Sequence, residues 1–456
     1  MKAGPRPSFT QGEKATAKYL ATYAEVEANS AEVVALQHGP FSHGLAIPAQ
    51  AEDQNIIGAL RGIPSGPTGP VLTVTVINAC TGASQNTLDS NLRSLKEIKQ
   101  HYGTGQALTS SIHVHKHPSG HLVVIDRSTQ NPLPPKQGVG LARKIGCDFL
   151  LAVAELGALK SPWLHCSDAD TRLPSQYFAQ ASGQAREHAT ALLYPFRHRE
   201  DSQSPTTHSF AMDYESSLRY YVLGLRFAES THDFHTVGSA MAVHANAYAK
   251  VRGFPRREAA EDFYLLNKLA KLGSIQQLGG PRIEPSSRAS NRVPFGTGAA
   301  IEKHLREPQD ELKVDHPIVF NYLKAWEATL TACLADPAQS KNLSNSIRRH
   351  AQSEPEVDAS RLLSALEKSG SILRADRAFK GPASTLNQRL RDSLDSFRTL
   401  KFIHALRDEG LAAQGLRKAL NEASFIRLHR SADRLSSLEV SEQLEELDYQ
   451  GAHSEN

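Results

Sequence analysis

An α/β architecture is indicated by this sequence, with helices on a mostly parallel central sheet and a helical region after it. Strand-like and helix-like segments alternate from about residue 44, which is the pattern of a parallel sheet whose strands are joined by helices. The segment Val71–Ile77 is apolar and rich in β-branched residues, as expected of a strand covered on both faces. After about residue 305 the strand patterns stop, and Thr385–Leu411 repeats apolar residues at helical spacing.

The composition is that of an ordinary globular protein: of 456 residues, 40% are hydrophobic and 22% are charged. The net charge of +3 provides no single-sign field, so nucleic acid is not an expected partner. The four cysteines form no CxxC pair, which argues against a zinc site or a disulfide scaffold. The N-terminus has no apolar signal-peptide segment, and the longest apolar run, Phe149–Leu159, is too short to span a membrane. We therefore expect a cytoplasmic protein without a transmembrane segment.

The first part of the chain alternates strands and helices after a helical beginning. Residues 12–37 have the apolar periodicity of one amphipathic helix. Three strands are then expected, each followed by a helix, and the third helix is entered through a glycine-rich turn. In chain order these segments are Gly44–Ala49, Glu52–Leu60, Val71–Ile77, Thr87–Tyr102, His121–Asp126 and Gly138–Leu159.

A fourth strand is expected to end in an acidic segment, and further strands and helices follow it. These segments are Ala191–Arg197, Tyr214–Ala228, Val237–His244 and Glu261–Leu272, before a loop over Pro281–Gly298. We predict a helical lead-in over residues 1–40, an α/β domain over 41–304 and a helical region over 305–456. The apolar stripe of the helical region needs a partner surface, which a second copy of the chain in a homo-oligomer could provide.

The acidic segment, residues 163–171, begins apolar and ends with Asp168 and Asp170. In an extended backbone, side chains two residues apart point to the same side, so these two carboxylates could hold one Mg²⁺ or Mn²⁺ ion. Such an ion would neutralise the charge on a diphosphate leaving group. The alternative is an acidic turn at the end of a strand, because Asp favours turns.

The order of these features resembles the family 2 glycosyltransferases, which have the GT-A fold, over about residues 42–298. Five motifs carry the resemblance. Leu45–Glu52 is similar to the opening IPAYNE strand, Gly138–Gly146 to the G-x-G-x-ARN-x-G helix start, Ser167–Thr171 to the DxD motif, Gly238–His244 with Val251–Pro255 to the acceptor-side strand and its GGFP turn, and Glu261–Leu265 to the ED-x-x-L motif.

The resemblance implies a metal-dependent glycosyltransferase that moves a hexose from a nucleotide diphosphate sugar to an acceptor hydroxyl, with inversion. The acceptor could bear a phosphate or a lipid carrier. Asp262 would be the general base that takes the proton of the hydroxyl. Glu261 is the other catalytic candidate of this motif, but it would face elsewhere, because neighbours in a helix diverge by about 100°. Acidic residues that merely stabilise a helix N-terminus are the structural alternative.

Six residues are the candidates for donor binding under this resemblance. They are Pro48, Glu52, Asn78, Gly138, Arg143 and Asp168. Asn78 stands where the family has the first aspartate of a DDGS-like sequence, and Gln50 and Ala51 replace Tyr and Asn, so the identity of the base stays open. The glycine-rich start at Gly138 would suit a phosphate, and Arg143 could pair with phosphate or with a carboxylate. A packing turn between strand and helix is the alternative for Gly138.

Arginines and histidines provide further candidates. Arg288 and Arg292 lie in the loop with glycine hinges and could contact a phosphate of the donor or the acceptor, or could simply be solvated. One of three histidines between the carboxylate motifs could complete a cation shell, although a hydrogen-bonded structural role is the alternative for each; these are His232, His235 and His244. His244 is also a candidate contact to a phosphate or to the acceptor. The alternating histidines His113, His115 and His117 could bind zinc, although an exposed hairpin tip is the preferred interpretation.

Two rival functions stay open at this stage. A retaining glycosyltransferase or a sugar nucleotidyltransferase could use the same nucleotide-binding sheet, and the anomeric configuration or the release of pyrophosphate would distinguish them. A non-catalytic nucleotide-binding or scaffolding protein on the same fold is the rival from another class. The change at Asn78 favours this second rival, whereas Asp168, Asp170 and Asp262 argue against it.

Overall fold

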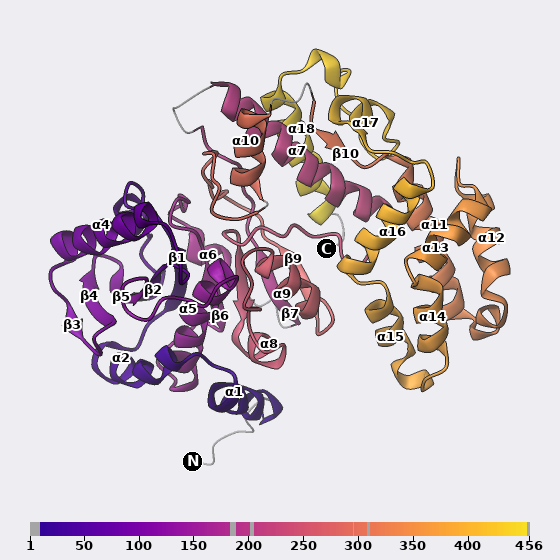
Figure 1. Ribbon diagram of the computed structural model, residues 1–456. Helices are drawn as coiled ribbons and strands as arrows, with labels where there is room; N and C mark the ends of the chain where they lie inside the picture. Colours follow the sequence, from indigo (N-terminus) through magenta and orange to yellow (C-terminus); the bar gives the residue numbers. More distant parts are fainter. Residues whose placement is uncertain (1–9, 183–187, 201–204, 295, 308–310, 454–456) are drawn as a thin grey trace. The chain divides into compact units, whose positions relative to one another are not determined.

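The structure is a computed structural model of the whole chain (Figure 1). It describes residues 10–182, 188–200, 205–294, 296–307 and 311–453. Contacts divide the chain into two compact units, and each unit is built from two separate stretches. The first unit comprises Met1–Arg199 and Thr236–Ser286, and the second comprises Glu200–His235 and Ser287–Asn456.

A large mixed sheet forms the centre of the first unit. In the described part of the chain it has nine strands in the order β3-β4-β5-β2-β1-β6-β8-β7-β9. Strands β5, β2, β1 and β6 are parallel, β4 and β8 run antiparallel to their inner neighbours, and β7 pairs with β9 in parallel. The bounds are β1 His43–Ala49, β2 Val71–Asn78, β3 Gln106–Ala107, β4 Ile112–His117, β5 Gly120–Arg127, β6 Trp163–Cys166, β7 Ala189–Leu193, β8 Met241–His244 and β9 Ser274–Gln277. The predicted α/β class with a mostly parallel sheet is confirmed.

Helices flank this sheet, and α5 is buried along nearly its whole length. Their bounds are α1 Thr10–Thr22, α2 Ala31–His38, α3 Ile56–Arg61, α4 Gln85–Tyr102, α5 Gly138–Glu155, α6 Tyr177–Gln180, α8 Ala245–Lys250 and α9 Glu261–Leu269. Gly146 lets α5 approach β1 closely, because a Cβ atom there would lie 3.0 Å from the Cβ of Ala46. Helix α5 ends at Glu155 rather than at Leu159, because Gly157 adopts a φ of +72°.

The predicted single helix over residues 12–37 is wrong. Helices α1 and α2 are separated by residues 23–25 and a 3-10 turn, Val26–Ser30. The physical reason is that α5 takes the hydrogen bonds that a continuous helix would need. The backbone N–H of Glu25 donates to Asp148 at 2.8 Å, and Lys144 donates to the carbonyl of Tyr23 at 2.9 Å.

The carboxyl ends of the parallel strands bring candidate residues to one edge of the sheet. Ala49, Asn78 and Cys166 end β1, β2 and β6, so Gln50 and Asp168 follow at this edge. Strand β8 runs the opposite way, and its first residue, Met241, pairs with Cys166. Ligands of open α/β sheets bind outside these carboxyl ends.

The second unit is helical, and α7 belongs to it. Its elements are α7 Pro205–Phe227, α10 Thr297–Arg306, α11 Ile318–Ala335, α12 Leu343–Ser353, α13 Ala359–Lys368, α14 Ser371–Phe379, α15 Leu386–Ser393, α16 Ser396–Asp408, α17 Leu416–Glu422 and α18 Ser437–His453, with 3-10 turns at Pro337–Asn342, Ala383–Thr385 and Ala432–Arg434. A short antiparallel pair joins β10, Lys313–Val314, to β11, Gln414–Gly415. None of the helices in the described ranges is long and apolar enough to cross a membrane.

The apolar core of the second unit shows why α7 joins it. Tyr220 of α7 is buried in the same cluster as Phe320 and Trp326 of α11. Gly224 of α7 receives the Phe320 ring so closely that an added Cβ would lie 2.5 Å from it. The chain therefore leaves the sheet after Arg199 and returns to it at Thr236, which differs from the single boundary at residue 304 that the sequence suggests.

A buried ionic cluster ties the two ends of the second unit together. Asp448 of α18 accepts hydrogen bonds from His235 at 2.8 Å, Arg219 at 3.1 Å and Arg226 at 3.2 Å. Although burial opposes ionisation of Asp448, the charges of His235, Arg219 and Arg226 hold the pKa of this carboxyl well below its usual range.

Candidate functional site

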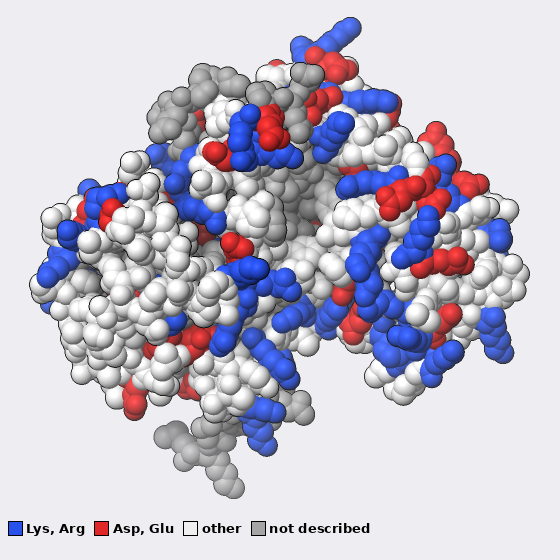
Figure 2. Space-filling view, viewed as in Figure 1, with Lys and Arg blue, Asp and Glu red and all other residues white. Residues whose placement is uncertain are grey.

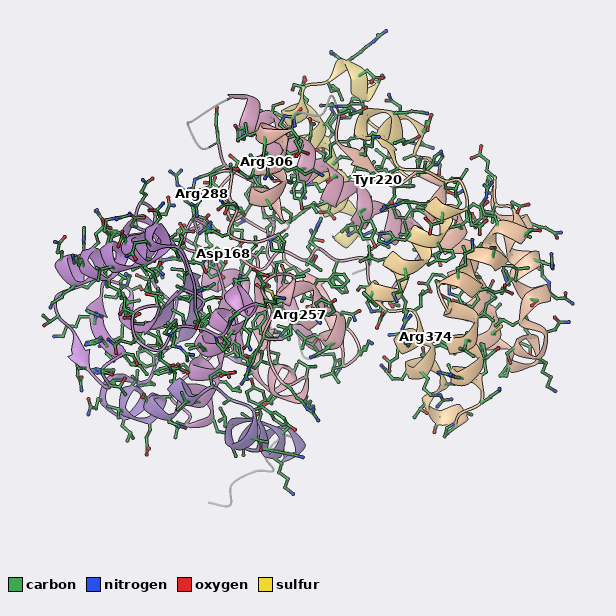
Figure 3. All side chains as sticks on the ribbon, in the orientation of Figure 1. Asp168, Tyr220, Arg257, Arg288, Arg306 and Arg374 are labelled. Atoms are coloured by element: carbon green, nitrogen blue, oxygen red, sulfur yellow. The ribbon has the colours of Figure 1, made fainter. Side chains whose placement is uncertain are left out.

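A buried arginine of α5, at the carboxyl edge of the sheet, binds the turn after β6 and the beginning of α9. Arg143 of α5 is 2% exposed and donates from Nη2 to Asp168 Oδ1 at 2.8 Å. Its Nε donates to Glu261 Oε1 at 3.1 Å, and its Nη1 lies 3.3 Å from the carbonyl oxygen of Ser167. A buried guanidinium needs such partners, because an unpaired buried charge is strongly destabilising. Figure 3 labels Asp168 in this unit.

Asp262 lies near the same arginine. A Cβ atom added at Gly238 would lie 2.9 Å from Arg143 Nη2 and 3.3 Å from Asp262 Oδ2, so both groups face this glycine. Burial and then the negative charge of Glu261 raise the pKa of Asp262 to about 7, although the N–H of Phe263 and Arg143 oppose this shift. A carboxyl group with a pKa near the working pH is well suited to general base catalysis.

The backbone before these two carboxylates is strained. Ala260 precedes α9 with φ 57° and ψ 23°, in the left-handed region that a residue with a Cβ atom rarely adopts. Such a conformation costs about 1–2 kcal/mol and persists where the surrounding structure fixes it. It sets the direction in which α9 begins, with Glu261 and Asp262 in its first turn beside Arg143.

The prediction that Glu261 faces away from the site is wrong. Glu261 is 4% exposed and forms an ion pair with Arg143, the same residue that holds Asp168. Both acids can reach the site because they are the first two residues of α9, and Arg143 lies against that end of the helix. Glu261 therefore orients the arginine.

Two amides meet at the ends of β1 and β2. Asn78 is 1% exposed, and its Nδ2 donates to Gln50 Oε1 at 3.3 Å. Asn91 of α4 fixes both strand ends, since it donates to the carbonyl of Asn78 at 2.9 Å and accepts from the N–H of Ala51 at 2.8 Å. Asn78 Oδ1 is buried and has no hydrogen-bond donor in the described residues. An unsatisfied buried acceptor costs about 1–3 kcal/mol, and an N–H donor of a ligand would remove that cost.

The other predicted donor residues have structural surroundings. Pro48 is buried inside β1, where it pairs with Val76 of β2. Glu52 is 4% exposed and accepts from Asn55 at 2.9 Å, just before α3 begins. At Gly138, a Cβ atom would lie 3.3 Å from the Cα of Glu258, and the N–H of Gly140 donates to the carbonyl of Arg257. The glycine-rich start of α5 thus packs against residues 255–258, which supports the packing alternative over a phosphate site.

Asp168 and Asp170 do not lie on an extended segment. The N–H of Thr171 donates to the carbonyl of Asp168 at 3.2 Å, which closes a turn after β6. Asp168 is paired with Arg143 but keeps 39% of its side chain exposed. Asp170 lines a cleft of about 500 Å³ between α3 and residues 169–173, where Arg199 donates to its backbone carbonyl at 2.7 Å. The premise of a shared strand face is therefore wrong.

Asp168 and Asp170 could still be ligands of a divalent cation. In the parts of the chain that the structure describes, no group of three or more His, Cys, Asp and Glu side chains is arranged to hold a metal. Two carboxylates with accessible oxygen atoms fit an ion that takes its other ligands from water and substrate phosphates, as Mg²⁺ commonly does. Asp168 and Asp170 are thus compatible with such an ion but do not enclose it.

The candidate histidines have structural partners. His244 pairs with Trp163 at the beginning of β6, whereas Asp168 follows the end of that strand, so the structure does not bring His244 to the acidic residues. His235 binds Asp448 in the second unit. The expected hairpin is present, because β4 and β5 pair antiparallel up to His117 and Gly120. The His117 side chain is not exposed at its tip, however, since it is buried between Ser119 and the carbonyl of Leu60.

Arg288 and Arg292 belong to the second unit. Arg292 Nε donates to Ser290 Oγ at 2.9 Å, and the N–H of Ser290 donates to the carbonyl of Gly298 at 2.9 Å. Their contact with a phosphate therefore stays a prediction. Sequence reasoning did not place Gln50 beside Asn78, although its position directly after β1, at the carboxyl edge, could have indicated it.

No protein-family model matches the chain, and no curated protein matches it. Among solved structures, residues 1–349 of S. aureus TarS in complex with UDP-GlcNAc match at 11% identity with a TM-score of 0.37, covering 81% of this chain and 92% of that one. The mannosyltransferase PcManGT from Pyrobaculum calidifontis, in complex with GDP-Man and Mn²⁺, matches at 13% identity with a TM-score of 0.34, covering 84% and 98%. These scores are too low to support an argument about this chain.

Proposed function

We propose that this chain is a glycosyltransferase that moves a hexose from a nucleotide diphosphate sugar to an acceptor hydroxyl, with inversion. The observation that carries the proposal is the meeting of Asp168, Glu261 and Asp262 around the buried Arg143. These residues come from three of the five motifs that resemble family 2 glycosyltransferases. They meet at the carboxyl edge of a parallel sheet, where nucleotides bind in such folds.

The nucleotide would bind across the ends of β1 and β2. The buried Oδ1 of Asn78 would accept an N–H of the base, and Gln50 holds the Asn78 amide in place. An amide presents both a donor and an acceptor, so it can pair with the edge of a base where the family has an aspartate.

The diphosphate would lie over the turn after β6. Asp168 and Asp170 would hold Mg²⁺ or Mn²⁺, which would neutralise the charge that develops on the departing diphosphate. Arg143 fixes the direction of the Asp168 carboxylate, because the arginine side of their ion pair is buried.

Asp262 would act as the base. The acceptor oxygen forms a bond to the anomeric carbon, the bond from that carbon to the diphosphate breaks, and the hydroxyl proton passes to an oxygen of Asp262. The raised pKa of Asp262 lets this carboxylate accept the proton near neutral pH. Glu261 is bound to Arg143 and serves to hold that arginine.

A donor-hydrolysis assay tests the proposal without a known acceptor. The full chain is incubated with a panel of nucleotide diphosphate sugars and Mn²⁺, and slow release of nucleoside diphosphate from one donor is expected. Release of pyrophosphate from nucleoside triphosphate and sugar phosphate would instead identify a nucleotidyltransferase. If no donor is hydrolysed or bound, the scaffolding alternative becomes the better account.

A further inference from the structure

The first unit carries a group of exposed cations just before and along α9. The basic cluster, as we define it, consists of Lys250, Arg252, Arg256, Arg257 and Lys268, all of which are exposed. From residue 250 to residue 271 the chain has six Lys and Arg residues against three Asp and Glu residues. Two of those three acids, Glu261 and Asp262, face Arg143 in the site. Figure 2 shows Lys and Arg side chains gathered where Figure 3 labels Arg257.

Contacts hold three members of the basic cluster together. The Arg257 guanidinium lies 3.9 Å from the centre of the Tyr264 ring, and Tyr264 is one helical turn before Lys268 on α9. Lys268 Nζ donates to the carbonyl of Val251 at 3.4 Å, next to Arg252. Consistent with this geometry, partial desolvation of its ammonium group and then the positive charges of Arg252 and Arg257 lower the pKa of Lys268.

These three cations are not neutralised. Within the described residues, Arg256 forms an ion pair with Glu25 at 2.7 Å, whereas Arg252, Arg257 and Lys268 form none with a carboxylate. Like charges held this close repel one another, so the arrangement costs stability in the absence of an anion. Aromatic rings hold two of the guanidinium groups in place, because Arg252 lies 4.9 Å from the Tyr23 ring.

We infer that the basic cluster binds a phosphate group of the acceptor, so that the acceptor is a phosphorylated or phosphodiester-containing molecule. This inference rests on the proposed function, and it names the class of acceptor that the site would take. Guanidinium groups bind phosphate through two parallel hydrogen bonds, and groups already fixed by ring contacts lose less entropy on binding.

The cluster lies to one side of the reacting centre. Tyr264 follows Asp262 by two residues on α9, so their side chains leave the helix about 200° apart. The phosphate would therefore be remote from the hydroxyl that reacts. Binding of this kind is made equally in the ground state and the transition state, so the cluster would lower the KM for the acceptor without changing kcat.

Inorganic tripolyphosphate is a probe that needs no knowledge of the acceptor. Its binding to the full chain is measured by calorimetry in EDTA, so that cation-dependent binding at Asp168 and Asp170 does not contribute. The variant Arg252→Gln/Arg257→Gln/Lys268→Gln is compared with the control Lys96→Gln/Lys99→Gln/Lys116→Gln, which removes three exposed cations elsewhere on the same unit. We expect affinity to fall at least about tenfold in the first variant, since one lost charged contact corresponds to roughly that factor, and to stay unchanged in the control.

Three results would overturn the inference: unchanged affinity in the first variant, an equal loss in the control, or wild-type binding to phosphatidylglycerol vesicles without binding to tripolyphosphate. The last result would identify a lipid surface as the source of the phosphate groups. Donor hydrolysis by the wild type is a separate measurement. Tripolyphosphate binding through the cluster in a chain that neither binds nor hydrolyses any donor would refute the proposed function and leave the anion site standing.

Discussion

Replacing Gly238 by alanine tests whether Arg143 is fixed by its partners. The added Cβ atom would lie 2.9 Å from Arg143 Nη2, closer than real Cβ contacts allow, so one of the two groups must move. Arg143 can move only by weakening its hydrogen bond to Asp168 or to Glu261. A hydrogen bond to a charged group contributes about 1.5–3 kcal/mol, so we expect the free energy of unfolding of the first unit to fall by about that amount.

The sign of the effect makes the test decisive. Gly238 does not have a positive φ, so alanine adds no backbone strain there. If Arg143 could swing aside at no cost, the substitution would stabilise the protein by about 0.4–1 kcal/mol through the lost entropy of the unfolded chain. Gly58→Ala in α3 is the matched control, because an added Cβ atom at Gly58 meets nothing within 4 Å. The control should be stabilised.

The assay can isolate the first unit. The chain has two tryptophans, Trp163 in β6 and Trp326 in α11, one in each unit. Trp326→Phe leaves Trp163 fluorescence as the reporter of urea unfolding of the sheet, and both glycine variants are made in that background. A Gly238→Ala protein as stable as its parent, or more stable, would refute the argument that Arg143 is pinned.

Four further outcomes are expected. Asp262→Asn should lower turnover about 10²–10⁴-fold with donor affinity unchanged. Because the carboxylate of Asp262 is the active form, wild-type turnover should rise as pH increases through about 7, and a flat pH profile would contradict this role. Asp170→Ala should abolish Mn²⁺-dependent binding of a nucleoside diphosphate in calorimetry, and unchanged affinity would exclude Asp170 as a ligand. The pKa of Asp448 is lowered in the folded state, so its contribution to the stability of the second unit is complete above the unfolded-state pKa of about 4 and is lost as the pH falls below that pKa. Asp448→Asn should remove this part of the pH dependence of stability, measured by urea unfolding followed by Trp326 fluorescence. A chain truncated after residue 304 should aggregate, because the apolar face of α7 would lose its contacts with Phe320 and Trp326. If the truncated chain is monomeric in gel filtration, α7 does not need these two residues to stay soluble.

Much of the sheet could be predicted from sequence because its strands are buried on both faces. Val71–Ile77 consists of apolar residues and two β-branched threonines, and the structure confirms it within β2. Helix α7 could also be predicted as a helix, but its periodicity does not say which unit its apolar face joins. Only contacts with Phe320, about a hundred residues later, decide that, and the linear alternation of strands and helices gave no sign of it.

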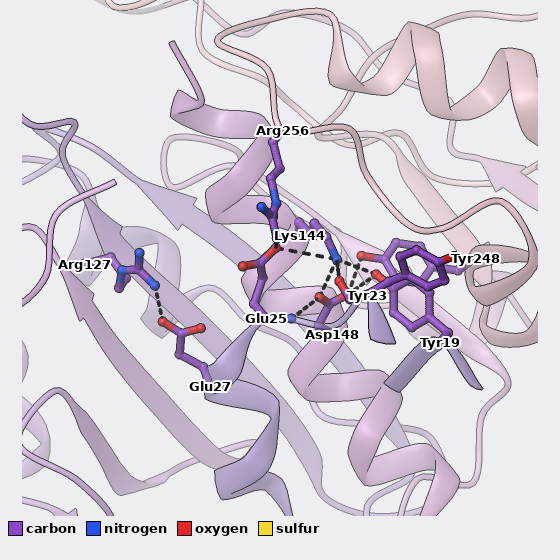
Figure 4. A network of polar contacts seen from close by, with 9 residues as sticks. All are labelled: Tyr19, Tyr23, Glu25, Glu27, Arg127, Lys144, Asp148, Tyr248 and Arg256. Atoms are coloured by element: carbon purple, nitrogen blue, oxygen red, sulfur yellow. Dashed lines mark hydrogen bonds and ion pairs between the residues drawn. The ribbon is translucent and has the colours of Figure 1, made fainter. Parts of the chain in front are cut away.

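The N-terminal segment shows a second limit. Lys144 and Asp148 lie one turn apart on α5, and no local sequence pattern indicates that they are buried. In the structure they are buried beneath the N-terminal segment, where Tyr19 and Tyr248 both donate to Asp148 Oδ1, at 2.6 and 2.8 Å (Figure 4). A charged pair can be buried only when partners from other segments satisfy it. Those partners come from positions 129 and 100 residues away, which local patterns cannot reveal.

In the candidate site, too, local patterns predict the residues but not the contacts between them. Strand ends and motifs located Asp168, Asp262 and Arg143, because residue type and position after a strand can be read locally. Strand ends and motifs could not show which of these residues contact one another. Arg143 forms ion pairs with both Asp168 and Glu261, and Asp262 faces Gly238 from the same site. The consequence is chemical, since removing the arginine would leave the negative charge of Glu261 beside Asp262 uncompensated and would raise the pKa of Asp262 further. The property that suits Asp262 to accept a proton therefore depends on a residue 119 positions earlier in the chain.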